Sequence, residues 1–271
     1  MSHEQAQGAA TLGLGAAAAL GENAASAALA SQTMEMKPII TGPHPLGGLL
    51  VVPPAANALV IFGHGSGTSR LGPSSHVARQ LERSGFAALF LDLLSPEEEG
   101  KPSNISDIDL LASRLTQATE WARCVPELRG LPIGYFGATS SGGAAIIAAA
   151  MNPAEVRAIV LLGGRPDLAG EWLSAVKAPT LLLVGSHDPQ VLEINHVAVA
   201  RMKCTVELCL IPGAGQSFDG RGALDYVDRQ TRQWFNRYLN PNEPAPIRLP
   251  SSDCRPCRFM SDCWINASAS P

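Results

Sequence analysis

The stretch Gly134-Tyr135-Phe136-Gly137-Ala138-Thr139-Ser140-Ser141-Gly142-Gly143 decides the fold of this chain. The apolar run 131–136 at its start predicts a short buried strand, and the apolar run 144–151 behind it predicts a helix. A strand, a tight turn of small residues and a helix form the setting of a nucleophile elbow. There a hydroxyl or thiol sits on a sharp turn before a helix N-terminus. The usual pattern is Gly-x-Ser-x-Gly, and neither frame of the turn, 137–141 or 138–142, matches it cleanly.

Continuous apolar segments recur on both sides of this turn. They predict further strands at 46–52, 58–62, 86–91, 156–162, 180–184 and 205–211. The segments between them predict helices at 74–84, 106–124, 170–176, 192–202 and 223–239, with Ser106 as the N-cap of the second helix and a loop at 92–104. Strands that alternate with helices and are mostly apolar throughout predict an α/β fold, with a mostly parallel central sheet and helices on both faces. Ligands of such sheets bind at the carboxyl ends of the strands.

The chain divides into three parts by composition. Residues 1–36 form a low-complexity leader rich in Ala, Gly and Ser, for which we expect no ordered structure. Residues 37–239 carry the strand and helix patterns, and 240–271 form a Pro-rich linker and a Cys-containing tail. The leader superficially resembles a secretion signal but has no Lys or Arg before its Ala-rich segment, so we expect a cytoplasmic protein.

The bulk composition bounds the classes of function. With 271 residues, 46% of them hydrophobic, the chain is long enough for one large α/β domain with a sizeable core. The net charge is −4 and no basic block stands out, so we expect no nucleic-acid partner. No uninterrupted apolar run approaches the roughly 20 residues that a membrane span needs, so we expect no membrane partner. The sequence leaves the oligomeric state open.

Five motifs follow one another between about residues 49 and 239. They are Gly63-His64-Gly65-Ser66-Gly67-Thr68-Ser69-Arg70, Leu91-Asp92-Leu93-Leu94-Ser95-Pro96-Glu97-Glu98-Glu99, Gly134-Tyr135-Phe136-Gly137-Ala138, Gly163-Gly164-Arg165-Pro166-Asp167-Leu168 and Ala178-Pro179-Thr180-Leu181-Leu182-Leu183-Val184-Gly185. In this order and spacing they resemble the α/β-hydrolase superfamily, and within it a dienelactone-hydrolase-like group. The resemblance implies the α/β-hydrolase fold, acyl transfer to water, a small ester or lactone as substrate, and no cofactor.

The family's reaction needs a nucleophile on the elbow, a His that takes its proton, an acid that orients the His, and two backbone N–H groups that stabilise the oxyanion. The resemblance implies that the N–H of Gly65 or Ser66 is one oxyanion donor and that the N–H of Ser140 is the other. It also implies that Asp188, which follows the strand 180–184, is the acid.

Two positions depart from the family pattern. Thr139 stands at the elbow position, where Ser or Cys is implied, and its γ-methyl group crowds a strained turn. Gln216 stands where the His is implied, and its amide cannot act as a general base near neutral pH. Two alternatives for the hydroxyls stay open. Ser140 acts instead if the turn slips by one residue, or Thr139, Ser140 and Ser141 cap the following helix.

The other His residues offer no clear replacement for the missing base. His187 is next to Asp188, at the same predicted edge of the sheet, and is the one candidate with supporting context. His64 lies in the implied oxyanion loop, where a structural hydrogen bond is expected. His76 and His196 fall on predicted helices, where we expect surface positions.

Two functional hypotheses follow from these residues. The first is a dienelactone-hydrolase-like hydrolase of a small ester or lactone with an atypical or impaired triad, favoured by the elbow, the oxyanion loop and Asp188. The alternative is a non-catalytic protein of the same fold that binds a small ligand or a protein partner, favoured by Thr139 and Gln216.

The cysteines suggest one further site. Cys254 and Cys257, followed by Cys263, have spacing that begins like a metal site, but no fourth ligand is evident unless Asp253, Asp262 or a Cys from elsewhere in the chain supplies it. We therefore expect a tail with incidental thiols and no bound metal. The remaining thiols fall in predicted helices or strands and are expected to be buried and unreactive: Cys124, Cys204 and Cys209.

Overall fold

The structure is a computed structural model that describes residues 39–41, 44–65, 73–218, 220 and 222–240. The expected leader 1–36 lies outside the described residues, as do residues 241–271 of the expected linker and tail. No helix within the described ranges has the length and apolar character required to cross a membrane.

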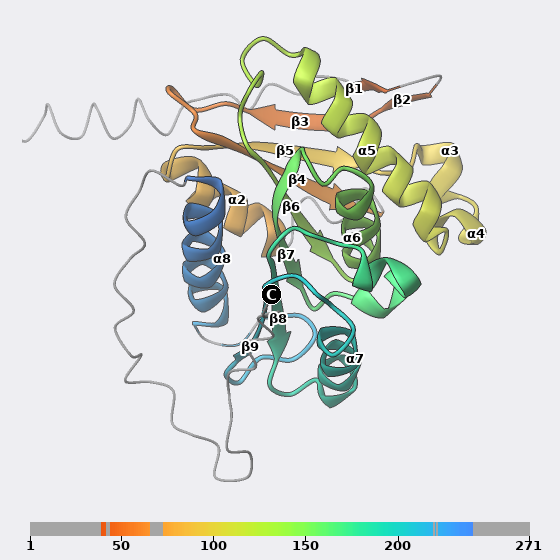
Figure 1. Ribbon diagram of the computed structural model, residues 1–271, viewed down its shortest axis with the longest axis vertical. Helices are drawn as coiled ribbons and strands as arrows, with labels where there is room; N and C mark the ends of the chain where they lie inside the picture. Colours follow the sequence, from red (N-terminus) through yellow and green to blue (C-terminus); the bar gives the residue numbers. More distant parts are fainter. Residues whose placement is uncertain (1–38, 42–43, 66–72, 219, 221, 241–271) are drawn as a thin grey trace, which may run out of the picture. The chain divides into compact units, whose positions relative to one another are not determined.

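A seven-stranded sheet forms the centre of the fold (Figure 1). Its spatial order is β3-β5-β4-β6-β7-β8-β9; β3 pairs antiparallel with β5, and every other pair is parallel. The strands are β3 (Gly48–Val51), β4 (Ala58–His64), β5 (Phe86–Asp92), β6 (Ile133–Ala138), β7 (Val156–Leu162), β8 (Thr180–Gly185) and β9 (Val206–Ile211). The strands β1 (Ile39–Thr41) and β2 (His44–Leu46) form a separate antiparallel pair. The predicted α/β fold with a mostly parallel sheet is confirmed.

Helices cover both faces of the sheet, as predicted (Figure 1). The helices are α2 (Pro73–Arg83), α3 (Pro96–Glu99), α4 (Pro102–Ile105), α5 (Ile108–Cys124), α6 (Ser141–Met151), the 3₁₀ helix η2 (Pro166–Ser174), α7 (Pro189–Val199) and α8 (Ala223–Leu239). Side chains of α2 and α8 pack with one face of the sheet. Those of α5, α6, η2 and α7 pack with the other face.

The centre of the sheet is apolar because both of its faces are covered. Every residue of β4 and β5 is buried, as expected for strands of a parallel sheet. The ring of Phe62 stacks on that of Phe90 and is tilted against that of Phe136. Its centroid lies 5.0 Å from the centroid of each. Gly134 allows α8 to approach the central strand, because a Cβ atom there would lie 2.7 Å from a ring carbon of Phe235.

Three predicted elements differ from the structure. The predicted strand 46–52 is divided, because Leu46 ends β2 and β3 begins at Gly48. The helix predicted at 170–176 is replaced by η2, which Gly170 interrupts with a φ of 54° and a ψ of −121°. The helix predicted at 192–202 begins earlier, at Pro189, and ends at Val199.

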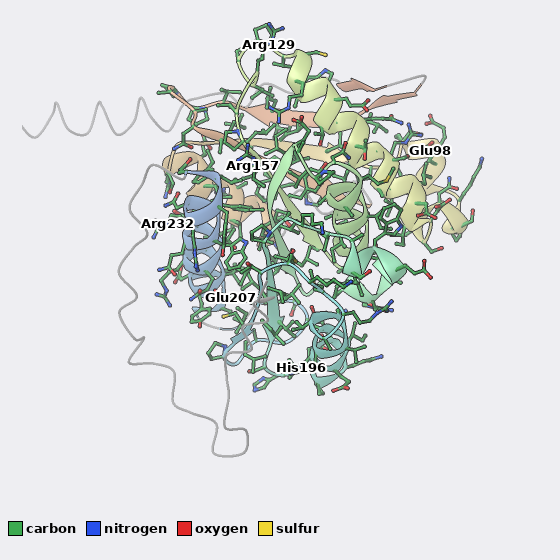
Figure 2. All side chains as sticks on the ribbon, in the orientation of Figure 1. Glu98, Arg129, Arg157, His196, Glu207 and Arg232 are labelled. Carbon is green, nitrogen blue, oxygen red and sulfur yellow. The ribbon has the colours of Figure 1, made fainter. Side chains whose placement is uncertain are left out.

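The loop predicted at 92–104 instead contains the short helices α3 and α4. A capping box stabilises the start of α3: Ser95 Oγ accepts from the N–H of Glu98, and the Glu98 carboxylate accepts from the N–H of Ser95. Glu98 also pairs with the buried Arg114 of α5, with Nη2 2.8 Å from Oε1, and Figure 2 labels Glu98 at α3. The prediction that Ser106 is the N-cap of the helix α5 is wrong. Its hydroxyl donates to carbonyls of α4, and Asp107 caps α5 by accepting from the N–H of Leu110 at 2.9 Å.

Candidate active site

The turn between β6 and α6 holds Thr139 in a strained conformation. Its φ is 50°, and it is one of three non-glycine residues in the described part of the chain with a positive φ. For a β-branched residue this conformation is an outlier, because the Cβ substituents collide with the backbone. The Thr139 side chain is exposed, whereas Ser140 already has helical angles, with φ −66° and ψ −32°. The strained, outward-facing position of the turn is therefore residue 139.

Close contacts on both sides fix this turn. A Cβ atom on Gly137 would lie 3.0 Å from the Cα of Gly142 and 3.0 Å from the carbonyl oxygen of Ser141, so the strand can approach the helix only with glycine there. On the other side, the N–H of Arg165, in the loop after β7, donates to the carbonyl of Thr139 at 2.9 Å. The turn is thus held in place by backbone contacts from both sides.

The three hydroxyls of the turn have different surroundings. Ser141 Oγ donates to the carbonyl of Ala138 at 2.8 Å and accepts from its N–H at 3.0 Å, which ties the helix back to β6. Ser140 occupies the N-cap of α6 but makes no capping bond with its side chain. Among the described residues, neither the Thr139 nor the Ser140 hydroxyl has a side-chain hydrogen bond. The interpretation of all three hydroxyls as helix caps is therefore wrong.

The loop after β4 lies beside the turn, because β4 and β6 are neighbours in the sheet. A Cβ atom on Gly65 would lie 3.8 Å from Ser140 Oγ, so the backbone at Gly65 passes close to the start of α6. Ser66, the other candidate oxyanion donor, lies outside the described residues.

The loops after β8 and β9 carry the candidate acid and Gln216, and hydrogen bonds join them. The N–H of His187 donates to the carbonyl of Ala214 at 2.9 Å, and the N–H of Gly213 donates to Ser186 Oγ at 3.0 Å. Asp188 is the N-cap of α7, and its Oδ1 accepts from the N–H of Val191 at 3.1 Å.

The Gln216 side chain is exposed. Asp188 and Gln216 follow the carboxyl ends of the neighbouring parallel strands β8 and β9, at one edge of the sheet. The structure shows a helix-capping role for Asp188, and no imidazole stands at position 216.

The described imidazoles differ in burial and in their contacts. His64 ends β4 and is buried, with its ring centroid 6.0 Å from that of Phe90. His187 is exposed, and His196 lies on α7 (Figure 2). His76 is not a simple surface residue as predicted, because its Nε2 lies 2.7 Å from a carboxylate oxygen of the buried Asp228.

Arg165, whose N–H bonds to Thr139, forms a bidentate ion pair with Asp167. Its Nε lies 2.8 Å from Oδ1 and its Nη2 lies 2.7 Å from Oδ2. These hydrogen bonds from the guanidinium lower the pKa of the Asp167 carboxyl. Neither residue was predicted to have a role, although the Gly163-Gly164-Arg165 turn at a strand end was a usable signal. The predicted burial of Cys124 is wrong, since its side chain is exposed; Cys204 and Cys209 are buried. The tail residues Cys254, Cys257 and Cys263 lie outside the described residues.

The strain at residue 139 leads to a stability prediction. We expect Thr139→Gly to raise the free energy of unfolding by about 0.5–1 kcal/mol, because glycine adopts a positive φ without a steric penalty and the Thr139 hydroxyl has no described partner to lose. Ser140→Gly is the matched control. It should lower stability by roughly a few tenths of a kcal/mol, because Ser140 is the N-cap of α6 and its side chain makes no capping bond. Urea unfolding of both variants measures the difference, and equal losses of stability would contradict a strained residue 139.

Comparisons with known proteins place this geometry among hydrolases. The crystal structure of a dienelactone hydrolase from Anabaena variabilis is 42% identical to this chain. It covers 76% of this chain and 99% of its own, with a TM-score of 0.72. Est1E from Butyrivibrio proteoclasticus is 16% identical, covers 74% of this chain and 98% of its own, and has a TM-score of 0.64, which is a likeness of fold alone. No family model matches the chain.

A second kind of relative comes from Mycobacterium tuberculosis. Proteins of strains CDC 1551 and H37Rv, which carry a provisional name as phosphoribosyl transferases, are each 46% identical to this chain over 202 residues. The match covers 74% of this chain but only 46% of each mycobacterial protein. This chain therefore matches less than half of the length of these curated relatives.

Proposed function

Because the chain belongs to the dienelactone hydrolase family of α/β-hydrolases, we propose that it hydrolyses a small ester or lactone at the turn between β6 and α6. The observation that carries the proposal is the strained, exposed Thr139 at this turn, with its φ of 50°. Strain of this kind persists only where the surroundings enforce it, and it is concentrated at functional sites. The contacts of Gly137 and Arg165 enforce it here.

In the proposed reaction, the hydroxyl oxygen of Thr139 attacks the carbonyl carbon of the substrate. The N–H groups of Gly65 and Ser140 are the proposed donors to the resulting oxyanion, supported by the nearness of Gly65 to Ser140. The C–O bond to the leaving group then breaks, and the alkoxide takes a proton from solvent and departs as the alcohol. Water then cleaves the acyl-threonine ester, which releases the carboxylic acid and restores the Thr139 hydroxyl. Without an imidazole at position 216, the hydroxyl proton leaves to solvent. We therefore propose a slow enzyme whose triad is impaired, because binding and oxyanion donors alone retain roughly 10³–10⁴-fold over water when a triad member is lost.

Steady-state assays with short-chain acyl esters and a lactone test this proposal. We expect measurable turnover by the native chain and a fall toward the buffer rate in Thr139→Val, which keeps the side-chain shape but removes the hydroxyl. Ser140→Ala is the matched control, since it keeps the backbone N–H and should retain most of the activity. Equal rates for the native chain and Thr139→Val would exclude the Thr139 hydroxyl as nucleophile.

A second candidate function is ligand binding without chemistry. The observation in its favour is that the Asp188 carboxylate caps α7, while the Gln216 side chain is exposed. Calorimetric binding of a non-hydrolysable phosphonate analogue, together with no turnover of the matching ester, would favour this function. The phosphoribosyl transferase name of the mycobacterial relatives is not part of the proposal, because more than half of each relative lies outside the matched region.

A further inference from the structure

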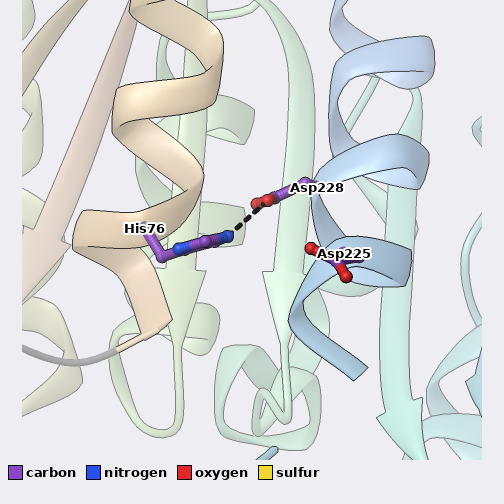
Figure 3. Close-up of side chains that lie close together, drawn as sticks. All are labelled: His76, Asp225 and Asp228. Atoms are coloured by element: carbon purple, nitrogen blue, oxygen red, sulfur yellow. Dashed lines mark ion pairs between the residues drawn. The ribbon is translucent and has the colours of Figure 1, made fainter. Parts of the chain in front are cut away.

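A His76–Asp225–Asp228 cluster joins the helices α2 and α8 (Figure 3). His76 lies in the first half of α2, and Asp225 and Asp228 are three residues apart on α8, so both carboxylates share one face of that helix. The imidazole nitrogen and the two carboxylate oxygens all lie within 4.8 Å of one another. Figure 3 shows the three side chains converging on the space between the helices.

The two carboxylate oxygens of Asp228 differ in their bonding. The residue is only 9% exposed, and its Oδ2 contacts His76 Nε2 at 2.7 Å. Its other oxygen, Oδ1, is buried and has no hydrogen-bond partner among the described residues. Buried carboxylate oxygens are normally bonded, because an unpartnered one loses the solvation that water would give it.

The donor set matches a first-row divalent cation. One neutral imidazole and two carboxylates carry a charge of −2, and imidazole together with carboxylate is a common ligand set for zinc. Three protein ligands would leave a fourth position of a tetrahedral ion to water. Asp225 is exposed, so rotation of its side chain can bring its oxygen within the shorter separation that zinc ligands need.

From this arrangement we propose that His76, Asp225 and Asp228 form a binding site for a zinc-like divalent cation that links α2 to α8. In the chain, α2 is the next described element after β4, and α8 is the next after β9 and Gln216. The inference does not rest on the proposed hydrolase function, because the ligands are defined by their own contacts.

The test uses the full chain, purified without an affinity tag, stripped with a chelator and titrated with Zn²⁺. We expect the cluster to bind one equivalent. At a free zinc concentration of 100 Kd, the midpoint of thermal unfolding should rise by about 5–10 °C. Asp225→Asn should abolish this shift and remove one equivalent of zinc, and it should leave the fold intact because Asp225 is exposed. Asp109→Asn is the matched control, since Asp109 is also an exposed carboxylate in the first turn of a helix.

Zinc held by the tail must be separated from zinc held by the cluster. The same titration is therefore repeated in a chain with Cys254→Ser, Cys257→Ser and Cys263→Ser. One equivalent that survives these three changes and is lost with Asp225→Asn supports the proposal. The proposal is overturned if the Asp225→Asn chain binds as much zinc as the native chain, or if its midpoint shifts by the same amount.

Discussion

Replacing Thr139 by Ser and Gln216 by His in one chain is expected to raise kcat/KM for short acyl esters by about 10²–10⁴-fold over the native chain, the range that a positioned general base contributes. Serine removes the γ-methyl group that crowds the strained turn. An imidazole at position 216 supplies a base on the loop that is hydrogen-bonded to the loop of Asp188. The measurement is steady-state kinetics on the same ester panel across the pH range in which an imidazole titrates.

The single changes separate the two contributions. Thr139→Ser alone should increase the rate only slightly, because no base takes the proton. Gln216→His alone should increase it more, and its rate should rise with pH as the imidazole loses its proton. Gln216→Asn is the control, since it alters the side chain without adding a base. If the double variant is no faster than the native chain, position 216 is not the position of the base.

The second large effect is expected at Gly185, the last residue of β8. A Cβ atom there would lie 2.5 Å from the carbonyl oxygen of Ala214 and 2.7 Å from that of Gly215, and both obstacles are backbone atoms that cannot rotate away. We expect Gly185→Ala to push the two loops apart and to lower the free energy of unfolding by about 3 kcal/mol, at the upper end of the range for overpacking. The midpoint of thermal unfolding should fall by about 6–12 °C.

Gly215→Ala is the matched control for this change. It adds the same methyl group in the same pair of loops, but no atom of the described residues lies within 4 Å of the Cβ atom that it introduces. Its unfolding midpoint should stay close to that of the native chain. A Gly185→Ala chain as stable as the Gly215→Ala chain would show that the two loops are not packed as closely as these distances imply.

The sheet was predictable because its strands are continuous apolar segments. The strand predicted at 156–162 agrees with β7 at both ends, and the helix predicted at 223–239 agrees with α8. Polar residues near helix ends were harder to assign. Ser106 and Asp107 are both good N-caps by residue type, and only the backbone path decides that Asp107 accepts from the N–H of Leu110. The helix α3 depends on the reciprocal bonds of Ser95 and Glu98, and Ser95-Pro96-Glu97-Glu98 carries the capping-box pattern with Pro at the first helical position, a signal that the predicted loop overlooked.

The turn between β6 and α6 was predictable in position but not in its bonding. The sequence placed the elbow after β6, and the structure adds the positive φ that distinguishes Thr139 from Ser140. Spacing alone did not show that Asp188 caps α7, because α7 begins three residues earlier than its apolar pattern suggests. The contact between His76 and Asp228 could not be predicted from the sequence either, since it joins two helices far apart in the chain.

The central claim is that residue 139 is the nucleophile position and that the missing imidazole limits the reaction. The most direct test is to treat the chain carrying Thr139→Ser and Gln216→His with a fluorophosphonate probe and to locate the adduct by peptide mass spectrometry. Both candidate hydroxyls lie in one short peptide, so fragmentation must resolve the bond between residues 139 and 140. We predict a single adduct on residue 139. An adduct on Ser140, or no adduct on either residue, would contradict the claim.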